Sequence, residues 1–359
     1  MGSRALWASI LVCLWCLTGP ARSAVAQNAD LPTLRLIATG GTIANRPGDR
    51  LSADELIASV PSVGRYAAVE SEQFTNVPSS ALTLDQWLGL ARRLNELFAE
   101  RADLDGVVVT SGTDTLEETA YFLHLTVRSK RPVVVVGAMR PPEAPGYDGA
   151  ANLLQAFRVA AHPASRGRGV LVVLNNEING ARDVTKTNAQ RLQAFSAGTR
   201  GVLGVVDDDR ITYFRRPGRR HTRSSEFDLG RVRRLPRVDI VMTYLDAPGD
   251  LVRAAVDAGA HGLVVAAAGA GSTTSAQREA LGAALERGLP VVITTRTGGG
   301  RVPSRTPRAG EDDEPDDPRF SPLRIEADDL APVKARILLM LALTRTRDGA
   351  EIQRMFGEY

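Results

Sequence analysis

The chain has 359 residues, which is enough for two domains that each bury a core of their own. Hydrophobic residues make up 43% and charged residues 24% of it, as in ordinary globular proteins. The formal net charge of +3 is close to balance, so charge gives no reason to expect a nucleic-acid partner, and none is predicted.

Residues 1–26 are predicted to be a secretory signal peptide. Arg4 precedes an apolar stretch at residues 5–17, a Gly-Pro pair breaks that stretch, and Ala-Val-Ala at residues 24–26 is a small-x-small cleavage signal. The stretch is too short to span a bilayer, so no membrane association is expected. The sequence therefore predicts a protein that is periplasmic or secreted.

The cysteine content fits this interpretation. Cys13 and Cys16 both lie in the apolar stretch, so a processed chain would have no cysteine and no disulfide. Such a protein must be held together by its core, with subunit association as a second source of stability. Removing Arg4 and Arg22 with the signal peptide takes the formal charge from +3 to +1.

From residue 34 to residue 214, apolar runs alternate with helical patterns. Unbroken Val, Ile and Leu runs are typical of parallel strands buried on both faces. The predicted strands are 34–38, 107–110, 132–137 and 169–174, and the predicted helices are 84–100 and 116–127. Thr115 and Glu118 predict a capping box at the start of the second helix. We expect an α/β fold whose larger N-terminal domain, residues 27–214, has a mainly parallel sheet covered by helices on both faces.

Residues 215–237 are rich in arginine and are interpreted as a linker. They lack the interleaved aromatic residues of a base-stacking surface, which favours a solvated segment whose arginines pair with acidic groups over an anion-binding patch.

Residues 238–359 predict a smaller C-terminal α/β domain. Its predicted strands are 239–243, 262–267 and 290–294, and its predicted helices are 250–258, 275–287 and 332–346. Residues 301–322 are rich in Pro, Arg and acids and are expected to form an exposed loop. The acidic run at 311–317 lacks the ligand spacing of an EF-hand, so it does not predict a calcium site.

The sequence shows no familiar metal or nucleotide motif. The histidines His124, His162, His221 and His261 have no paired spacing with carboxylates. The Gly-Gly-Thr turn at residues 40–42 lacks both the lysine of a P-loop and the third glycine of a dinucleotide fingerprint. No Gly-x-Ser-x-Gly elbow occurs either. We therefore expect no metal and no organic cofactor.

Two strand ends carry the residues that are suited to catalysis. Each of the segments 36–44 and 107–118 runs from a strand through a Gly- and Thr-containing turn into a helix, where free N–H groups favour an anion or a developing oxyanion. Thr42 lies on the first turn, and Thr113 and Asp114 lie on the second. Lys186 follows a third strand, within residues 180–188.

These residue types complement one another chemically. A threonine hydroxyl is a poor nucleophile until a base accepts its proton. A lysine can do so if burial lowers its pKa, and a neighbouring aspartate can hold it in place. Taken singly, each residue is more simply a turn cap or a surface lysine. Together, at strand ends of one sheet, they predict a catalytic site.

These same segments resemble a known family. Thr-Gly-Gly-Thr-Ile-Ala at residues 39–44 and the segment 111–123 look like the two signature segments of bacterial L-asparaginases. Segments 136–141, 182–188 and 334–339 extend the similarity over essentially the whole processed chain, in the order of the exported type II branch. The resemblance implies hydrolysis of the side-chain amide of L-asparagine to L-aspartate and ammonia, without a cofactor.

The resemblance also implies a role for each candidate residue. Thr42 would be the nucleophile that forms an acyl-enzyme, and Thr113, Asp114 and Lys186 would move the proton. Backbone N–H groups near the two turns would stabilise the oxyanion.

Substrate binding is implied in the same way. Ser79 would hold the α-carboxylate of the substrate, and Asp114 would meet its α-ammonium, next to Thr113. Ser80 stands where the family usually has Gln or Glu for that ammonium. The resemblance further implies a homotetramer of intimate dimers, in which the partner's C-terminal domain completes each active site.

The sequence departs from the family at several positions. The lid at residues 45–50 is short and has no tyrosine, and Ala270 replaces an asparagine that supports the site across the subunit boundary. The family disulfide is absent, with Ser129 at one of its positions. The partner's glutamate cannot be aligned, and Glu311 and Glu314 are both candidates.

Two other functions stay open at this point. One is an amidohydrolase that prefers glutamine, a D-amino acid amide or a β-aspartyl compound. The other is an exported amino-acid-binding protein without turnover, although binding alone would not need an activated nucleophile. The sequence sets neither the ratio of asparagine to glutamine turnover nor the affinity.

Overall fold

The computed structural model describes residues 31–303 and 321–359. The predicted signal peptide and most of the predicted acidic loop, with Glu311 and Glu314, lie outside these residues. Within them, no helix is both long enough and apolar enough to cross a membrane.

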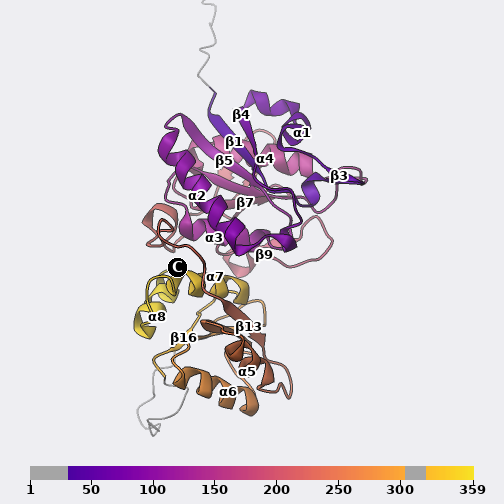
Figure 1. The fold of residues 1–359 in the computed structure, drawn as a ribbon. Helices are drawn as coiled ribbons and strands as arrows, with labels where there is room; N and C mark the ends of the chain where they lie inside the picture. Colours follow the sequence, from indigo (N-terminus) through magenta and orange to yellow (C-terminus); the bar gives the residue numbers. More distant parts are fainter. Residues whose placement is uncertain (1–30, 304–320) are drawn as a thin grey trace, which may run out of the picture. The chain divides into compact units, whose positions relative to one another are not determined.

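An eight-stranded sheet forms the N-terminal domain, in the order β12-β11-β8-β7-β6-β5-β1-β4 (Figure 1). The five strands from β4 to β7 are parallel, and β8, β11 and β12 are antiparallel additions at one side. The mainly parallel sheet expected from the sequence is confirmed. Its strands are β1 (Thr33–Ala38), β4 (Ala68–Gln73), β5 (Leu104–Thr110), β6 (Val133–Val136), β7 (Val170–Leu174), β8 (Glu177–Gly180), β11 (Gly204–Val206) and β12 (Ile211–Tyr213).

Helices cover both faces of this sheet, because alternate strand residues point to opposite sides. Val107 and Val109 pack into the buried cluster that includes α2 (Leu84–Glu100) and α3 (Leu116–Thr126). Val108 packs on the other side, in the cluster that includes α1 (Ala53–Ala58) and α4 (Gly149–Ala161). The expectation of helices on both faces is confirmed.

The capping box predicted at the start of α3 is wrong. Thr115 has φ −123° and ψ 20°, instead of the extended conformation that aims a cap hydroxyl into the first turn, and its side chain makes no cap hydrogen bond. Its hydroxyl donates instead to the carbonyl oxygen of Ser79 at 3.0 Å. A long-range partner has therefore displaced the local cap.

The C-terminal domain has a four-stranded parallel sheet, in the order β13-β14-β15-β16. The smaller second domain predicted from the sequence is confirmed. Its elements are β13 (Val238–Met242), α5 (Asp250–Asp257), β14 (Gly262–Ala267), α6 (Ser275–Glu286), β15 (Val291–Thr295), β16 (Arg324–Glu326), α7 (Pro332–Ala342) and α8 (Gly349–Glu358).

Short elements shape the loops. The hairpins are β2 (Asn45–Arg46) with β3 (Asp49–Arg50) and β9 (Thr185–Lys186) with β10 (Phe195–Ser196). The single-turn helices are η1 (Thr42–Ala44), η2 (Pro61–Arg65), η3 (Ser79–Ala81), η4 (Pro163–Ser165), η5 (Gly198–Arg200) and η6 (Thr222–Ser224).

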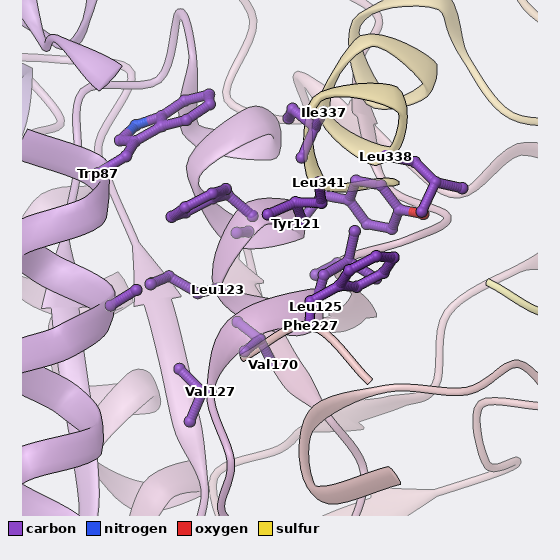
Figure 2. Packing of buried hydrophobic residues seen from close by; sticks show 14 of the residues in the cluster. Trp87, Tyr121, Leu123, Leu125, Val127, Val170, Phe227, Ile337, Leu338 and Leu341 are labelled. Carbon is purple, nitrogen blue, oxygen red and sulfur yellow. The ribbon is translucent and has the colours of Figure 1, made fainter. Parts of the chain in front are cut away.

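The arginine-rich segment 215–237 is tied into the fold at several points. Arg219 pairs with Asp328 at 2.8 Å, and Arg220 contacts Glu358. Phe227 is 1% exposed and belongs to the same buried cluster as residues of α3 and α7 (Figure 2). The sequence-based domain limits, 27–214, 215–237 and 238–359, stay a prediction.

Candidate active site

The two Gly- and Thr-containing turns meet because β1 and β5 are neighbours in the sheet. Ala38 lies opposite Thr110 in the parallel register, so the residues after each strand continue side by side. The Thr39 hydroxyl donates to the carbonyl oxygen of Thr110 at 2.6 Å, and the Thr39 N–H donates to the Thr110 hydroxyl at 3.2 Å.

Glycine lets the turns touch. A Cβ atom on Gly41, where φ is +89°, would lie only 2.3 Å from the backbone nitrogen of Gly112. A Cβ atom on Gly112 would lie 2.8 Å from the Ser79 Oγ. Both positions therefore need glycine, because any side chain would push three loops apart. Thr42 and Thr113 directly follow these two glycines.

Lys186 completes a cluster on the second turn. Its Nζ donates to the Thr113 hydroxyl at 3.0 Å and to Asp114 Oδ1 at 2.7 Å. Thr113 is 5% exposed, whereas the Asp114 side chain is 72% exposed. The amine thus sits beside a buried hydroxyl, with an open carboxylate on the other side. When the amine is neutral, the same contact lets it accept the proton of the hydroxyl.

The backbone around Lys186 is held by Glu117, which the sequence analysis missed. Glu117 Oε1 accepts hydrogen bonds from the Lys186 N–H at 3.1 Å and from the Thr185 hydroxyl at 2.8 Å. Glu117 lies in the first turn of α3, just after Asp114, and is 8% exposed. The sequence signal that could have revealed it is helical spacing, because Glu117 falls on the same helix face as the apolar residues Ala120 and Tyr121, and lone buried charges need partners.

Thr42 lies in η1 and is half-buried. Its hydroxyl makes no hydrogen bond within residues 31–303 and 321–359. The short hairpin of β2 and β3 follows it, and the Tyr147 hydroxyl donates to the carbonyl oxygen of Ile43 at 2.8 Å. Burial raises the pKa of Tyr147 to about 12, so this phenol stays a donor.

The two candidate substrate-binding serines differ. Ser79 is buried, and its Oγ accepts a hydrogen bond from the Thr115 N–H at 3.3 Å. Ser80 is exposed and has no hydrogen-bond partner in the part of the chain that the structure describes. Ala270 is exposed, in the turn between β14 and α6. The structure therefore brings Ser79 against the second turn, with Ser80 beside it in the chain.

Several ionisable groups on or near α3 have shifted pKa values. Burial raises the pKa of Glu118 to about 7, and burial lowers the pKa of Lys334 to about 8. His124, which is buried and accepts a hydrogen bond from the Val170 N–H, has its pKa lowered well below the usual value by burial. Among the described residues, no three His, Cys, Asp or Glu side chains are grouped so as to hold a metal ion.

The structure is that of a two-domain α/β protein, with a cluster of hydroxyl, amine and carboxylate groups at the strand ends of its larger sheet. Residues 33–219 match the family model described as "Asparaginase, N-terminal", and residues 237–356 match the "Glutaminase/Asparaginase C-terminal domain". The chain belongs to the bacterial asparaginase family and is an enzyme of its type II-like branch.

Individual relatives agree with this assignment. The chain is 42% identical to L-asparaginase 2 of Bacillus subtilis, over 94% of this chain and 89% of the relative. It is 40% identical to the probable periplasmic L-asparaginase of Haemophilus influenzae, over 93% of this chain and 95% of the relative. A crystal structure of a probable cytoplasmic L-asparaginase from Campylobacter jejuni matches with a TM-score of 0.83 and 40% identity, covering 91% of this chain and 99% of that chain.

The expectation of a periplasmic or secreted protein is corrected by these comparisons. The matching Campylobacter jejuni structure is described as probably cytoplasmic, whereas the Haemophilus influenzae relative is named periplasmic. The fold therefore occurs in relatives with either location. The physical reason is that residues 31–359 contain no cysteine, so the domains need no oxidising compartment for their stability.

Proposed function

We propose that this enzyme hydrolyses the side-chain amide of L-asparagine to L-aspartate and ammonia, with Thr42 as the nucleophile. The observation that supports this most is the placement of the Lys186 amine at 3.0 Å from the Thr113 hydroxyl and 2.7 Å from Asp114. That cluster lies on the turn that packs against Gly41, directly before Thr42. The L-asparaginase names of the relatives favour the same substrate.

The chemistry would proceed in two steps. The Thr42 oxygen attacks the amide carbon while its proton passes to the Thr113–Lys186 pair, and N–H groups of the two turns stabilise the oxyanion. The proton then passes to the leaving nitrogen, ammonia departs, and an ester to Thr42 remains. Water attacks this acyl-enzyme, giving aspartate and restoring the Thr42 hydroxyl.

Substrate binding would use the rim of the same site. Ser79 would hold the α-carboxylate, and the exposed carboxylate of Asp114 would meet the α-ammonium, with Thr113 and Ser80 beside them. The open side of Asp114 supports this assignment, because its other oxygen is free to accept a charge-assisted hydrogen bond.

Exposed apolar residues support the proposed self-association. Edge strand β13 and the segment after it expose Ile240, Met242, Tyr244 and Leu245, and Leu245 is 95% exposed. Such a patch on an unpaired strand edge is typical of a protein interface. We propose a homotetramer in which the partner's C-terminal domain completes each active site. Light scattering and activity across a dilution series test this, and a fully active monomer would contradict it.

A panel of amides tests the function itself. Ammonia release is measured from L-asparagine, L-glutamine, D-asparagine and a β-aspartyl amide, with Thr42→Ala as the control. We expect the highest kcat/KM with L-asparagine. A preference for glutamine is the second candidate, since the C-terminal family model covers glutaminases as well. Tight asparagine binding without ammonia release would instead establish an amino-acid-binding protein.

A further inference from the structure

Lysine is rare in this chain, and one of its lysines is buried away from the substrate. Only Lys130, Lys186 and Lys334 occur among 44 lysine and arginine residues. Lys130 is exposed, and Lys186 belongs to the candidate active site. Lys334 lies in the first turn of α7, in the C-terminal domain, and is 1% exposed. A buried ammonium group is costly unless it is well paired, so its position needs an explanation.

Lys334 holds the segment that leads into the catalytic lysine. Its Nζ donates to the carbonyl oxygen of Arg182 at 2.9 Å and to that of Val184. The next residues along the chain are Thr185 and Lys186, which form β9. A compact ammonium with three donors suits two carbonyls and a carboxylate, which a planar guanidinium would fit poorly.

Glu117 links this contact to the other half of the cluster. Its Oε2 lies 3.7 Å from the Lys334 Nζ, while its Oε1 accepts the two hydrogen bonds from Thr185 and Lys186. Because Glu117 lies at the start of α3, directly after the Thr113 turn, its carboxylate links this turn to β9. Helix α3 therefore fixes β9 through Glu117, and α7 fixes residues 182–184, just before β9, through Lys334.

The two helices that carry these groups pack in one buried cluster. Figure 2 shows Tyr121 of α3 beside Leu338 and Leu341 of α7, all fully buried. Arg182 adds a second anchor, since it donates to Asp329 at 2.8 Å and to the main-chain oxygen of Tyr359 at 2.5 Å. The segment before β9 is therefore tied to the C-terminal domain at two points.

We propose that Glu117 and Lys334 are positioning residues that set Lys186 against Thr113 and Asp114, so that α7 of the C-terminal domain controls proton transfer in the N-terminal domain. The inference rests on the proposed function, because Lys186 moves a proton only there. Neither residue touches the substrate site directly.

The charges of the pair compensate each other. Glu117 and Asp183 offset the buried Lys334 ammonium, and Arg182 acts against it. Glu118, on the same turn of α3, also interacts with Glu117 and Lys334. Removing either member of the pair leaves the other buried with less compensation, so we expect β9 to shift in each single variant.

The test uses Lys334→Met, Glu117→Gln, the double variant, and Lys130→Met as the matched control. We expect kcat to fall roughly 10- to 100-fold in both single variants with KM nearly unchanged, because small misplacement of a catalytic group costs this much. Lys130→Met should match the wild type.

An unchanged kcat in folded Lys334→Met would overturn the inference. If a single variant does not fold, the double variant, which leaves no lone buried charge, carries the test, and an unchanged kcat in it is equally decisive.

A readout without turnover keeps this inference separate from the proposed function. In protein with ¹⁵N-labelled lysine, the Lys186 amine signal should move in Lys334→Met and stay in place in Lys130→Met. A wild type that releases no ammonia would refute the proposed function, and a stationary Lys186 signal would refute the positioning role.

Discussion

The turns after β1 and β5 are similar in sequence but are held in place by different contacts. Side chains of two other segments bind the Thr113 turn, Ser79 through the Thr115 N–H and Lys186 through the Thr113 hydroxyl. The Thr42 turn is held by the close approach of Gly41 and by the Tyr147 hydroxyl, which donates to the carbonyl oxygen of Ile43, and the Thr42 hydroxyl is unbonded in the described residues. The structure thus fixes the Thr113 hydroxyl in place by a side-chain hydrogen bond and leaves the Thr42 hydroxyl without one.

The largest expected effect comes from removing either hydroxyl. We expect Thr42→Ala and Thr113→Val each to lower kcat by about three orders of magnitude, because nucleophile and proton-transfer group act as a unit. Thr212→Val, on the edge strand β12, is the control and should keep wild-type turnover. Steady-state kinetics measure both effects. Near-normal turnover in Thr42→Ala would contradict the proposal that Thr42 is the nucleophile and Thr113 the proton-transfer group.

The next effect tests the contact between the turns. Gly41→Ala would place a Cβ atom against the backbone of Gly112, and its φ is positive, so we expect a loss of about 2–4 kcal/mol in the free energy of unfolding. Gly48 has φ +79° but no atom within 4 Å of a built Cβ, so Gly48→Ala should cost only about 1 kcal/mol. Urea denaturation measures both, and equal losses would show that backbone strain alone is responsible.

Glu118 gives a smaller, pH-dependent effect on the Thr113 side. Burial raises the pKa of its carboxyl to about 7, above the ordinary value of 4.5. Between these values the folded chain keeps a proton that the unfolded chain has lost, so this group's contribution to stability falls as the pH rises through the window. Glu118→Gln should match the wild type at pH 4 and be more stable at pH 8 by about 3 kcal/mol.

Denaturation at the two pH values measures this effect. Glu143→Gln replaces an exposed carboxylate and should show no difference between them. A Glu118→Gln variant that gains equally at pH 4 and pH 8 would contradict the assigned cause.

The smallest effect concerns the rim between the turns. Ser80 and Ala270 are shorter than the residues that usually surround the α-ammonium in the family, so the double variant Ser80→Gln with Ala270→Asn should lower the KM for asparagine by roughly tenfold. Kinetics on both single variants and the double variant measure it. A micromolar KM in the unaltered protein would mean that the site lacks no contact.

The sequence predicted elements well where one local pattern decides them. Helix α2 runs over Leu84–Glu100 as expected, because its apolar spacing coincides with a real capping box at Thr83. Helix α4 was not predicted. Asp148 stands at its start but does not cap it, because its carboxylate accepts hydrogen bonds from the N–H groups of Met139 and Arg140 instead.

The residues of the candidate site also differ in how well the sequence predicts them. The residues on the two turns could be proposed from strand-turn-helix patterns alone. Glu117 gives only the signal of a carboxylate on an apolar helix face and Lys334 gives none, because their partners come from distant parts of the chain. Strand β9 is only two residues long and has no periodicity, so its position follows from tertiary contacts alone.

The scarcity of lysine has a practical consequence for chemical labelling. Of the three side-chain amines, that of Lys334 is enclosed, that of Lys186 is hydrogen-bonded and its side chain is 16% exposed, and Lys130 is open to solvent. Among the lysine side chains, an amine-reactive dye or polymer should therefore attach at Lys130 first. Besides the α-amine of the N-terminus, Lys130 is thus the preferred handle for conjugation, and it is not one of the residues proposed for catalysis.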